Sequence, residues 1–376
     1  MNVTDKATVN LTPRLITDYE QLRDIWSKQD AVHGNAQSFD WFDCWRRQVN
    51  ADSFVAGLFA GNEPIMLLPL EVLRMNGARV LRYPGGSHAN CNFPWLDGQV
   101  HYKSIENLVT AIRKVRPDVD VLSLTRQLPS LSGRDNPLLQ TKSAENPNPV
   151  LAASITCGFE SVLERSNAKR KLKKHRQHGR RYEEAGGWRI YRPESRLQSE
   201  QALDAFFALK AHRFKQMGIS DPFAAADIQA FFKQLYSHAA EQQSPNFELQ
   251  VLEVNGKIRS LIGKSISKSG PTVEFSAIAD DELMTASPGE FLFYEDIKKN
   301  CESGRDIYSF GIGDEPYKRE WCDIQSSIYD TIIPLTAKGK AFTALQSARS
   351  KVVAAIKGNP RLWQLAKTLR SKLARR

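Results

Sequence analysis

The chain repeats one order of secondary-structure signals in its two halves. Each half predicts two helices, three strands joined by tight turns, a further helix and a further strand. The turns at Gly61 and Asn255 are 194 residues apart (255 − 61), and the strands near Asp120 and Ile307 are 187 apart (307 − 120). A length of 376 residues also exceeds what one hydrophobic core usually serves. We therefore expect two copies of one α/β unit.

The predicted elements follow from apolar spacing and turn residues. In the first half we expect helices that begin near Thr17 and Ser38, where a capping residue precedes apolar residues at helical spacing. The other predicted elements of that half are strands at 54–59, 65–73 and 80–83, a helix at 103–115 and a strand at 119–124. The second half predicts helices at 198–216 and 226–241, strands at 247–254, 258–266 and 272–279, a helix at 288–301 and a strand at 307–310.

Composition indicates a folded protein without a membrane span. Hydrophobic residues make up 41% of the chain, which is enough for a sizeable core. The longest apolar runs, such as residues 64–70, fall far short of the roughly 20 residues that a span requires, and the N-terminus has no apolar signal region. We expect a cytoplasmic protein. The five cysteines have neither CxxC nor Cys/His spacing, so we expect reduced thiols and no metal.

Positive charge is concentrated in two segments. The net charge is +10, but residues 337–376 contain eleven Lys or Arg, and residues 165–181 contain nine, with no acidic residue in either segment. The rest of the chain therefore carries −10 (10 − 11 − 9). The segment 165–181 predicts a basic helix, which is a solvated helix, a nucleic-acid contact or an anionic-ligand site. No nucleic-acid-binding motif accompanies it, so we do not expect a nucleic-acid partner.

Ionisable residues gather between Gly311 and Trp321, directly behind the predicted strand at 307–310. The stretch reads GIGDEPYKREW and contains two adjacent carboxylates, a phenol and two cations. Loops on rigid strands are where catalytic groups concentrate. The corresponding place in the first half, residues 126–133, contains no carboxylate. We therefore expect the chemistry in the second copy.

The order helix, helix, three antiparallel strands, helix and strand resembles that of the GNAT superfamily of acyl-CoA-dependent N-acyltransferases, and three segments of the second half carry a narrower resemblance. They are the basic helix at 167–181, the Ser287-Pro288-Gly289 turn before a helix, and the stretch Gly313 to Lys318 that precedes Trp321. More specifically, they look like the CelD-type acetyltransferases linked with cellulose and exopolysaccharide biosynthesis. The resemblance covers residues 155–335, and the first half more loosely as a degenerate copy. Fem-type aminoacyl ligases of peptidoglycan synthesis are similar in having two such domains in tandem.

The resemblance implies an α/β (α+β) fold of tandem GNAT-like domains. Each domain is expected to have a mixed, mostly antiparallel sheet flanked by helices, and basic helices follow at the C-terminus. We expect a degenerate domain at residues 1–150, a catalytic domain at 151–336 and a basic amphipathic tail at 337–376. Basic amphipathic helices bind anionic membrane surfaces, so the tail predicts peripheral contact with the inner membrane or with a synthase complex. Docking on the acidic body of the protein is the alternative.

Transfer of an acyl group to an amine requires a base for the amine proton and an acid for the departing thiolate. Asp314 and Glu315 are candidate bases, Tyr317 is a candidate acid, and Lys318 lies beside them. Their catalytic roles follow from these residue types and from the resemblance. The alternative is a surface pair of Glu315 and Lys318 at the start of a short helix that opens at Pro316.

The donor is expected to be acetyl-CoA or another acyl-CoA as co-substrate. Ser287, Pro288 and Gly289 precede a helix whose first N–H groups suit the CoA pyrophosphate. A simple Pro-Gly helix start is the other interpretation. The chain lacks the superfamily's usual Gln/Arg-x-x-Gly-x-Gly/Ala loop at this place, so a larger acyl-CoA, an acyl carrier protein or an aminoacyl-tRNA stays open as the donor.

The expected acceptor is a small molecule or glycan, namely an amino group of a polysaccharide or cell-envelope precursor. The residues predicted to bind it are His88, Asn90, Asp97, Arg170 and Trp321. Two other functions stay open at this point. One is a Fem-like ligase that uses charged tRNA, and the other is a non-catalytic component of a polysaccharide synthesis complex.

Overall fold

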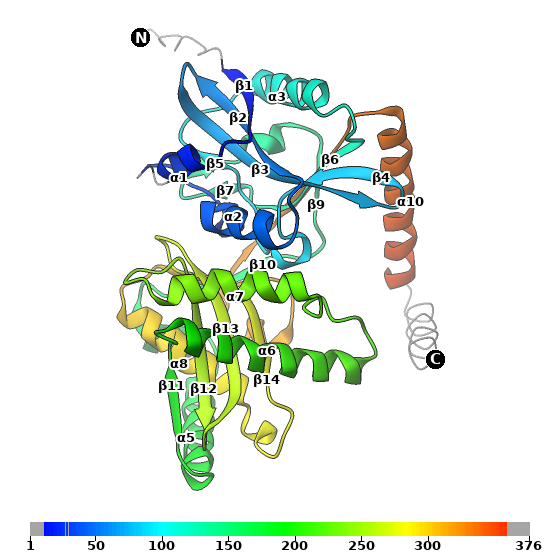
Figure 1. The fold of residues 1–376 in the computed structure, drawn as a ribbon. Helices are drawn as coiled ribbons and strands as arrows, with labels where there is room; N and C mark the ends of the chain where they lie inside the picture. Colours follow the sequence, from blue (N-terminus) through cyan, green and yellow to red (C-terminus); the bar gives the residue numbers. More distant parts are fainter. Residues whose placement is uncertain (1–10, 27, 29, 359–376) are drawn as a thin grey trace, which may run out of the picture. The chain divides into compact units, whose positions relative to one another are not determined.

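The computed structural model describes residues 11–26, 28 and 30–358. These residues form two compact units, of which the first takes residues 11–146 and 328–346 and the second 147–327 and 347–358. Each unit contains one large mixed sheet, mostly antiparallel, with helices packed against it (Figure 1). The predicted fold class is therefore confirmed. No described helix is both long and apolar enough to cross a membrane.

The first unit contains the repeat predicted for the first half and several shorter elements. Its longer strands agree with the predicted ranges within a few residues. Its helices and strands are β1 (Thr12–Ile16), α1 (Glu20–Trp26), η1 (Asn35–Gln37), α2 (Phe39–Gln48), β2 (Ser53–Ala60), β3 (Glu63–Met75), β4 (Ala78–Arg82), η2 (Gly86–His88), β5 (Trp95–Leu96), α3 (Tyr102–Val115), β6 (Val121–Gln127), β7 (Ser130–Leu131), β8 (Arg134–Asp135), η3 (Pro137–Gln140), β9 (Ser143–Glu145) and β17 (Tyr329–Pro334).

The second unit follows the same plan. Its hairpin turn lies at Asn255 and Gly256, as the sequence predicts. Both residues adopt the positive φ (49° and 70°) that this turn requires. The elements are β10 (Val150–Ser154), α4 (Gly158–Glu164), α5 (Ala168–Glu184), β11 (Trp188–Tyr191), α6 (Arg196–Met217), α7 (Ala226–Ala240), β12 (Phe247–Val254), β13 (Lys257–Ile266), β14 (Pro271–Ile278), η4 (Met284–Ala286), α8 (Pro288–Glu302), β15 (Ile307–Ile312), α9 (Pro316–Arg319) and β16 (Ile324–Ser326).

The two sheets correspond strand for strand. The first has the order β1-β2-β3-β4-β6-β17-β9, and the second has the order β11-β12-β13-β14-β15-β10-β16. In the first sheet, however, the sixth strand is β17, which follows the entire second unit in the chain. In the second sheet the sixth strand is β10, which precedes the other strands of its unit. The sixth strands are therefore exchanged with respect to a simple tandem repeat.

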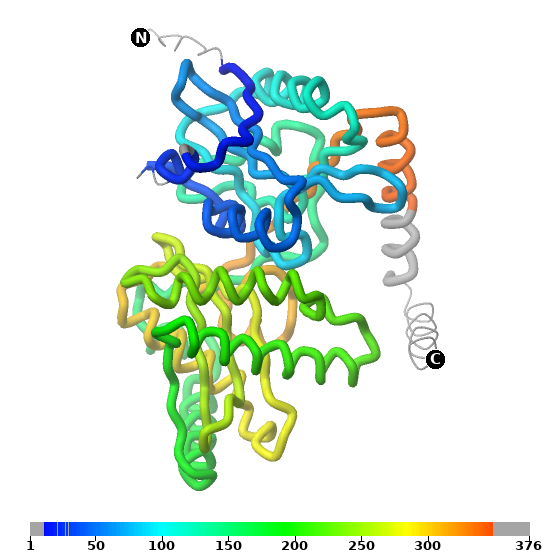
Figure 2. The backbone as a smooth tube through the Cα atoms, in the orientation of Figure 1, coloured from blue at the N-terminus to red at the C-terminus, as the bar shows by residue number. Residues whose placement is uncertain are grey.

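The return of β17 to the first sheet moves the domain boundary away from the predicted residue 336. In Figure 2 the orange segment after residue 328 rejoins the blue and cyan unit. Thr331 of β17 lies opposite Leu124 of β6. Its buried hydroxyl accepts a hydrogen bond from Gln127 Nε2 (2.8 Å) and lies 2.6 Å from the hydroxyl of Ser143 in β9. Thr331 thus links both neighbouring strands, and the first sheet is incomplete without β17.

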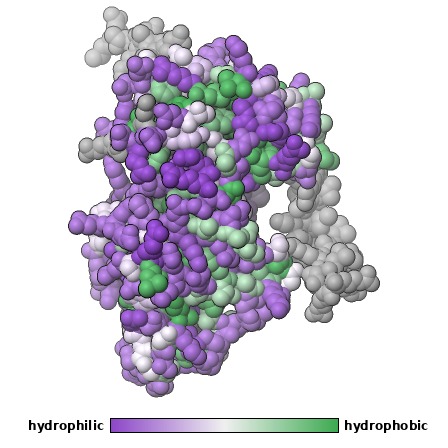
Figure 3. All heavy atoms as spheres, in the orientation of Figure 1, coloured by the Kyte–Doolittle hydropathy of each residue, from purple (hydrophilic) through white to green (hydrophobic). Residues whose placement is uncertain are grey.

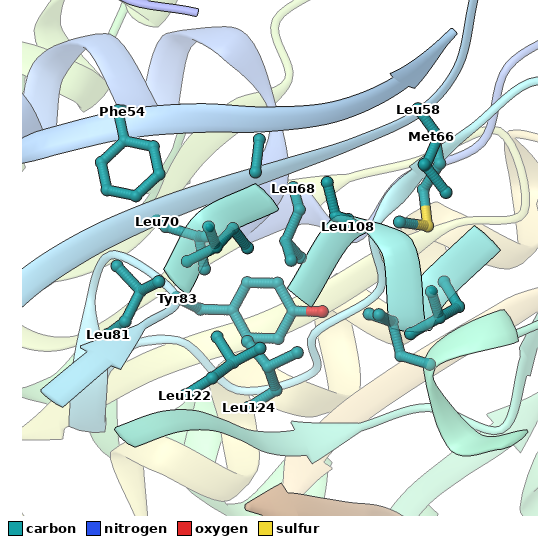
Figure 4. Close-up of a cluster of buried hydrophobic side chains, with 14 of the residues drawn as sticks. Phe54, Leu58, Met66, Leu68, Leu70, Leu81, Tyr83, Leu108, Leu122 and Leu124 are labelled. Carbon is teal, nitrogen blue, oxygen red and sulfur yellow. The ribbon is translucent and has the colours of Figure 1, made fainter. Parts of the chain in front are cut away.

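Each unit has its own core. In the first unit, aliphatic side chains of β2, β3, β4 and β6 pack against α3, and the ring of Tyr83 lies among them next to Leu70 and Leu124 (Figure 4). In the second unit, aromatic rings from α6, α7 and β14 fill one face of the sheet. Gly263 has no side chain for a steric reason, because a Cβ there would lie 2.1 Å from the ring of Phe275.

The start of the predicted basic tail forms a helix, α10 (Ala337–Gly358). The second helix predicted for the tail, after Asn359 and Pro360, lies outside the described residues. On the face shown in Figure 3 the surface is mainly hydrophilic, with small apolar groups between charged side chains. This surface agrees with a charged fraction of 25%.

The exchange of strands predicts that the second unit folds alone and that the first does not. A fragment of residues 147–327 retains all seven strands of its sheet, whereas residues 1–146 lose β17 and leave β6 and β9 without their shared neighbour. Unpaired strand edges favour aggregation. We expect cooperative urea unfolding, followed by circular dichroism, for the fragment of residues 147–327 and not for residues 1–146.

A linked fragment provides the control for this prediction. Residues 146 and 328 are adjacent, since the N–H of Asn146 donates to the carbonyl of Ile328 (2.8 Å). Joining residues 1–146 to 328–358 through a short Gly-Ser linker is therefore expected to restore cooperative unfolding. Cooperative unfolding of residues 1–146 alone, at the stability of the linked form, would contradict the assignment of β17.

Candidate functional site

The site begins where β14 and β15 part. These neighbouring strands are parallel and pair at a single position, Thr272 with Ser309. In the first unit the equivalent strands β4 and β6 pair at two positions, and Asn92 then forms a bridge to Gln127. The buried loop around Asn92 thus continues the pairing along β6 in the first unit. Among the described residues, no strand or bridge does the same beside the end of β15.

The loop after β15 is anchored at its base. The N–H of Gly313 donates to the carbonyl of Pro149, which precedes β10 (2.9 Å). Lys318, whose exposed fraction is 5%, donates from Nζ to the carbonyl of Ile312 (2.7 Å) and forms an ion pair with Glu315 (2.8 Å). Lys318 therefore connects α9 to the end of β15. The structure assigns this predicted catalytic residue an anchoring contact.

The two carboxylates of the loop have different partners. Asp314 forms an exposed ion pair with Arg319, whose hydrogen bond lowers the pKa of the Asp314 carboxyl below its usual value. A carboxylate with a lowered pKa is a weaker base. Glu315 precedes the first residue of α9, and its side chain folds back over Gly313, where a Cβ would lie 2.6 Å from Oε2 of Glu315. Both predicted bases are therefore ion-paired, Asp314 with Arg319 and Glu315 with Lys318.

Tyr317 is the most accessible aromatic residue of the loop. Its exposed fraction is 44%, and its ring stacks on Phe293 of α8 (centroids 5.9 Å apart) and contacts Phe310 of β15. Burial, and to a smaller extent the negative charge of Glu315, raises the pKa of Tyr317 to about 12. The hydroxyl is therefore protonated at neutral pH and can donate a proton. The structure thus places the predicted acid in α9 and one predicted base, Glu315, at the N-cap of that helix.

Two residues predicted to bind the acceptor lie where α5 meets the site loop. Trp321 ends the loop and contacts α5, and Arg170 belongs to α5 and contacts the loop. The ring of Trp321 is buried, and Nζ of Lys171 lies 3.5 Å from its centre. Arg170 donates to Glu320 (3.0 Å), and Nζ of Lys171 lies 3.5 Å from the same carboxylate. Burial lowers the pKa of Lys171. α5 therefore holds the C-terminal end of the site loop.

The Ser287-Pro288-Gly289 turn starts α8 as predicted. Ser287 has the left-handed backbone (φ 49°, ψ 60°), and Pro288 is the first helical residue. A Cβ on Gly289 would lie 2.9 Å from Cγ2 of Ile278 at the end of β14. Glycine therefore lets the helix approach the strand closely. The first N–H groups of α8 consequently lie beside the end of β14.

A row of α5 residues faces the start of α8. Lys174 lies 3.7 Å from Glu290, and Arg181 donates to the hydroxyl of Thr285 (2.8 Å). Tyr182 donates to the carbonyl of Ala286 (2.7 Å). Between these contacts lies His178, which is buried and whose pKa is lowered by burial. The sequence analysis identified the charge of this helix but not these contacts, although the spacing of residues 174, 178 and 181 marks one helical face.

Three carboxylates follow β14 and face other partners. Asp281 and Glu282 both form ion pairs with the buried Arg259. Asp280 accepts a hydrogen bond from Gln216 of α6 (2.7 Å). These partners reduce the negative potential next to the start of α8.

His88, Asn90 and Asp97 lie in the first unit. His88 ends η2, with its ring 6.4 Å from that of Trp45, and Asp97 lies 3.6 Å from Nζ of Lys28. Asn90 is part of the same loop. Their role in acceptor binding stays a prediction, as does that of Arg170 and Trp321.

One cavity lies away from the predicted site. It has a volume of about 850 Å³ and lies along β11, β12 and the second half of α8. Its lining includes Gln250, Glu295 and Lys299, and none of the residues predicted from the sequence to be catalytic, donor-binding or acceptor-binding lines it. No metal-binding group of three or more His, Cys, Asp or Glu is present among the described residues.

Comparison with protein families identifies the second unit. Residues 169–319 match the family described as "Acetyltransferase (GNAT) domain". The match covers 151 of the chain's 376 residues and relates the second unit to this family, so we call that unit the GNAT domain. The match begins on α5 and ends on α9, so the basic helix and the site loop both belong to the domain. The narrower CelD-type assignment stays a prediction. A search of curated protein sequences gave no significant match.

Several solved structures resemble the whole chain. FemX has a TM-score of 0.57 at 11% identity, with 85% of this chain and 97% of FemX covered. The C-terminal domain of a protein assigned as a lysylphosphatidylglycerol synthetase from Agrobacterium fabrum has a TM-score of 0.50 at 13% identity, with 88% and 95% covered. A conserved protein of unknown function from Bacteroides thetaiotaomicron has a TM-score of 0.51 at 12% identity, with 87% and 100% covered. At these identities the likeness shows a shared fold.

Loss of the Lys318 anchor is expected to destabilise the GNAT domain. Lys318→Met leaves the half-buried carbonyl of Ile312 without the Lys318 donor, which costs about 1–3 kcal/mol of unfolding free energy. Arg319→Met removes only an exposed ion pair and is expected to change stability by less than about 1 kcal/mol. Urea unfolding of both variants measures the difference. Equal effects would show that Lys318 does not anchor the loop.

Lys171→Met is expected to change how stability depends on pH. Burial lowers the pKa of Lys171 in the folded protein below the usual 10.5. Between the lowered pKa and 10.5 the unfolded chain therefore binds more protons, and the free energy of unfolding rises with pH relative to that of the variant. Urea unfolding across this range measures the difference, with the exposed Lys173→Met variant as the baseline. A difference that falls as the pH rises would mean that Glu320 and Trp321 favour the protonated amine.

Proposed function

We propose that the GNAT domain transfers an acyl group from acyl-CoA to an amino group. The observation that carries this proposal is the position of Tyr317. Its protonated hydroxyl lies on the loop that leaves β15, next to Phe293 of α8 and within the same matched domain as the start of that helix. A departing CoA thiolate requires a proton donor, and the CoA pyrophosphate requires an anion-binding site such as a helix start.

The donor's pyrophosphate would bind at the start of α8. The first N–H groups of a helix are unpaired and attract anions. Lys174 and Arg181 of α5 lie along this end, with His178 between them. Glu290, in the first turn, already has Lys174 as its counter-charge. The α5 cations thus support an anionic donor at a helix start that carries its own carboxylate.

The reaction would proceed by direct attack. The amine nitrogen bonds to the thioester carbonyl carbon, and the carbon–sulfur bond then breaks. Glu315 accepts the proton that the amine loses, and Tyr317 gives a proton to the departing thiolate sulfur. Tyr317 regains its proton from protonated Glu315 or from water. An amide and a free CoA thiol result.

The acceptor proposed here is an amino group on a polysaccharide or cell-envelope precursor. The resemblance of the loop from Gly313 to Lys318 to the CelD-type family supports this acceptor class. The fold likeness to FemX does not distinguish acceptors, because at 11% identity it concerns the architecture.

Free thiol released from acyl-CoA in the presence of amino sugars tests the proposal. With the full-length chain we expect thiol release from acetyl-CoA or a longer acyl-CoA. Tyr317→Phe is expected to lower kcat about 100-fold with little change in the KM for the donor, because it removes only the proton donor. Lys174→Gln with Arg181→Gln is expected to weaken donor binding about tenfold in calorimetry, because charge-assisted contacts are lost.

The matched control for donor binding is Arg176→Gln, which removes an α5 cation on another face of the helix. It is expected to leave the dissociation constant of the donor unchanged. Unchanged kcat in Tyr317→Phe would remove that residue from the mechanism. If no acyl-CoA binds, the donor assignment is wrong.

A Fem-like aminoacyl-tRNA-dependent ligase is the second candidate. Asp280, Asp281 and Glu282 lie between β14 and α8 in the chain, and Arg259 offsets only one of their three negative charges, since Gln216 is neutral. The remaining negative charge opposes a pyrophosphate. An ester-linked aminoacyl donor would not place a pyrophosphate at this position. Amide formation from aminoacyl-tRNA, without thiol release from any acyl-CoA, would support this candidate instead.

A further inference from the structure

The structure divides the Lys and Arg residues of α5 into two sets, and the two acidic residues, Glu183 and Glu184, end the helix. The inner set contacts the rest of the domain: Arg170 and Lys171 approach Glu320, Lys174 approaches Glu290, and Arg181 donates to Thr285. The outer set is Lys169, Lys173, Arg176 and Arg180. These four recur every three or four residues, so they lie on one side of the helix. We call this side the outer face of α5.

The outer face has no role in packing. All four side chains are exposed, and none forms an ion pair among the described residues. The opposite side of the helix carries the buried residues Lys171, His178 and Tyr182. Apart from a hydrogen bond from Nε of Arg176 to the carbonyl of Leu172 in the same helix (3.4 Å), no hydrogen bond or ion pair among the described residues uses the outer cations.

The arrangement also weakens the helix. Neighbouring cations three or four residues apart repel each other, at about 0.2–0.5 kcal/mol for each pair, and the outer face contains three such pairs in succession. From Lys169 to Arg180 the helix rises by eleven steps of about 1.5 Å, so the four charges extend along about 16 Å of helix. An anionic partner along this length would relieve the repulsion.

An apolar residue beside the cations decides the kind of partner. Leu172 is 40% exposed and lies three residues after Lys169 and four before Arg176, which places it beside the outer face. The outer face contains no aromatic residue, and stacking on aromatic rings is typical of sites for single-stranded nucleic acid. Cations beside an aliphatic side chain are typical of helices that lie on anionic membranes.

We propose that the outer face of α5 binds the surface of a bilayer that contains acidic phospholipids. The four cations attract the headgroups, and Leu172 enters the boundary between headgroups and acyl chains. The inner cations stay on the start of α8 and on Glu320. Binding at the outer face is therefore separate from donor binding at the inner face, and does not depend on the proposed reaction.

Co-sedimentation with vesicles tests this proposal on the full-length chain. The test variant replaces Lys169, Lys173, Arg176 and Arg180 by Gln, and the matched control replaces Arg213, Lys215, Lys257 and Lys298, which are exposed cations elsewhere in the second unit. Both variants have the same net charge and retain residues 337–376. Vesicles of phosphatidylglycerol and phosphatidylcholine are compared with vesicles of phosphatidylcholine alone.

We expect binding to the acidic vesicles only. The test variant is expected to lower the partition coefficient by about fivefold for each cation removed, whereas the control lowers it less than about threefold. Leu172→Ser is expected to lower vesicle binding severalfold. Because the removed cations repel one another, the test variant is expected to unfold at the wild-type temperature or above.

Three results would overturn the proposal. Equal losses in the test and control variants would mean that net charge, and not the outer face, attracts the vesicles. Unchanged binding in the test variant would place the contact elsewhere in the chain. Tighter binding to single-stranded RNA than to acidic vesicles, lost in the test variant and unaffected by Leu172→Ser, would make the partner a nucleic acid. Calorimetry with acyl-CoA on the test variant separates this outcome from a failure of the donor site.

Discussion

The pairing of β10 with β15 is the interaction on which the candidate site depends. Val150 lies opposite Ile312, and the N–H of Gly313 donates to the carbonyl of Pro149. This pairing holds the last residues of β15 on one side, while β14 departs on the other. The site loop therefore leaves a strand that is secured at its end. Lys318 then turns back to the carbonyl of Ile312 and holds α9 against the same strand end.

The exchange of sixth strands makes the two units unequal. The GNAT domain is continuous in sequence, because all of its strands lie between residues 147 and 327. The first unit is interrupted and completed only by β17. The two units also differ beside the fifth strand of the sheet, which is β6 in the first unit and β15 in the second. In the first, Asn92 continues the pairing along β6. In the second, no described strand or bridge continues the pairing beside the end of β15, where the loop with Tyr317 begins.

The helix α5 connects the parts of the site. Its inner face contacts Glu320 behind the loop and the first turn of α8, so one helix supports both the proposed acid and the proposed donor site. Its buried Lys171 and His178 would be costly to place in a helix that served only as a solvated surface. The cations of the outer face form no such contacts, so their presence requires a different explanation.

Sequence patterns predicted most of the fold, because they depend on neighbouring residues. The strand at 247–254 and the hairpin at Asn255 follow from local alternation and turn chemistry, and both lie as predicted. Short strands with little alternation were missed, including β10 and β17. Their place depends on partners that are more than 150 residues away in the chain, Ile312 and Leu124.

The sequence by itself determined that two α/β units exist and that the ionisable loop belongs to the second. Only the tertiary structure decided what the loop's residues contact. Lys318 resembles a catalytic residue in sequence, yet its amine is used by the carbonyl of Ile312, an acceptor that exists only once β15 ends there. Likewise, the nine cations of residues 165–181 look equivalent until packing separates an inner from an outer face. Local pattern sets the elements, whereas burial and distant partners set the role of each side chain.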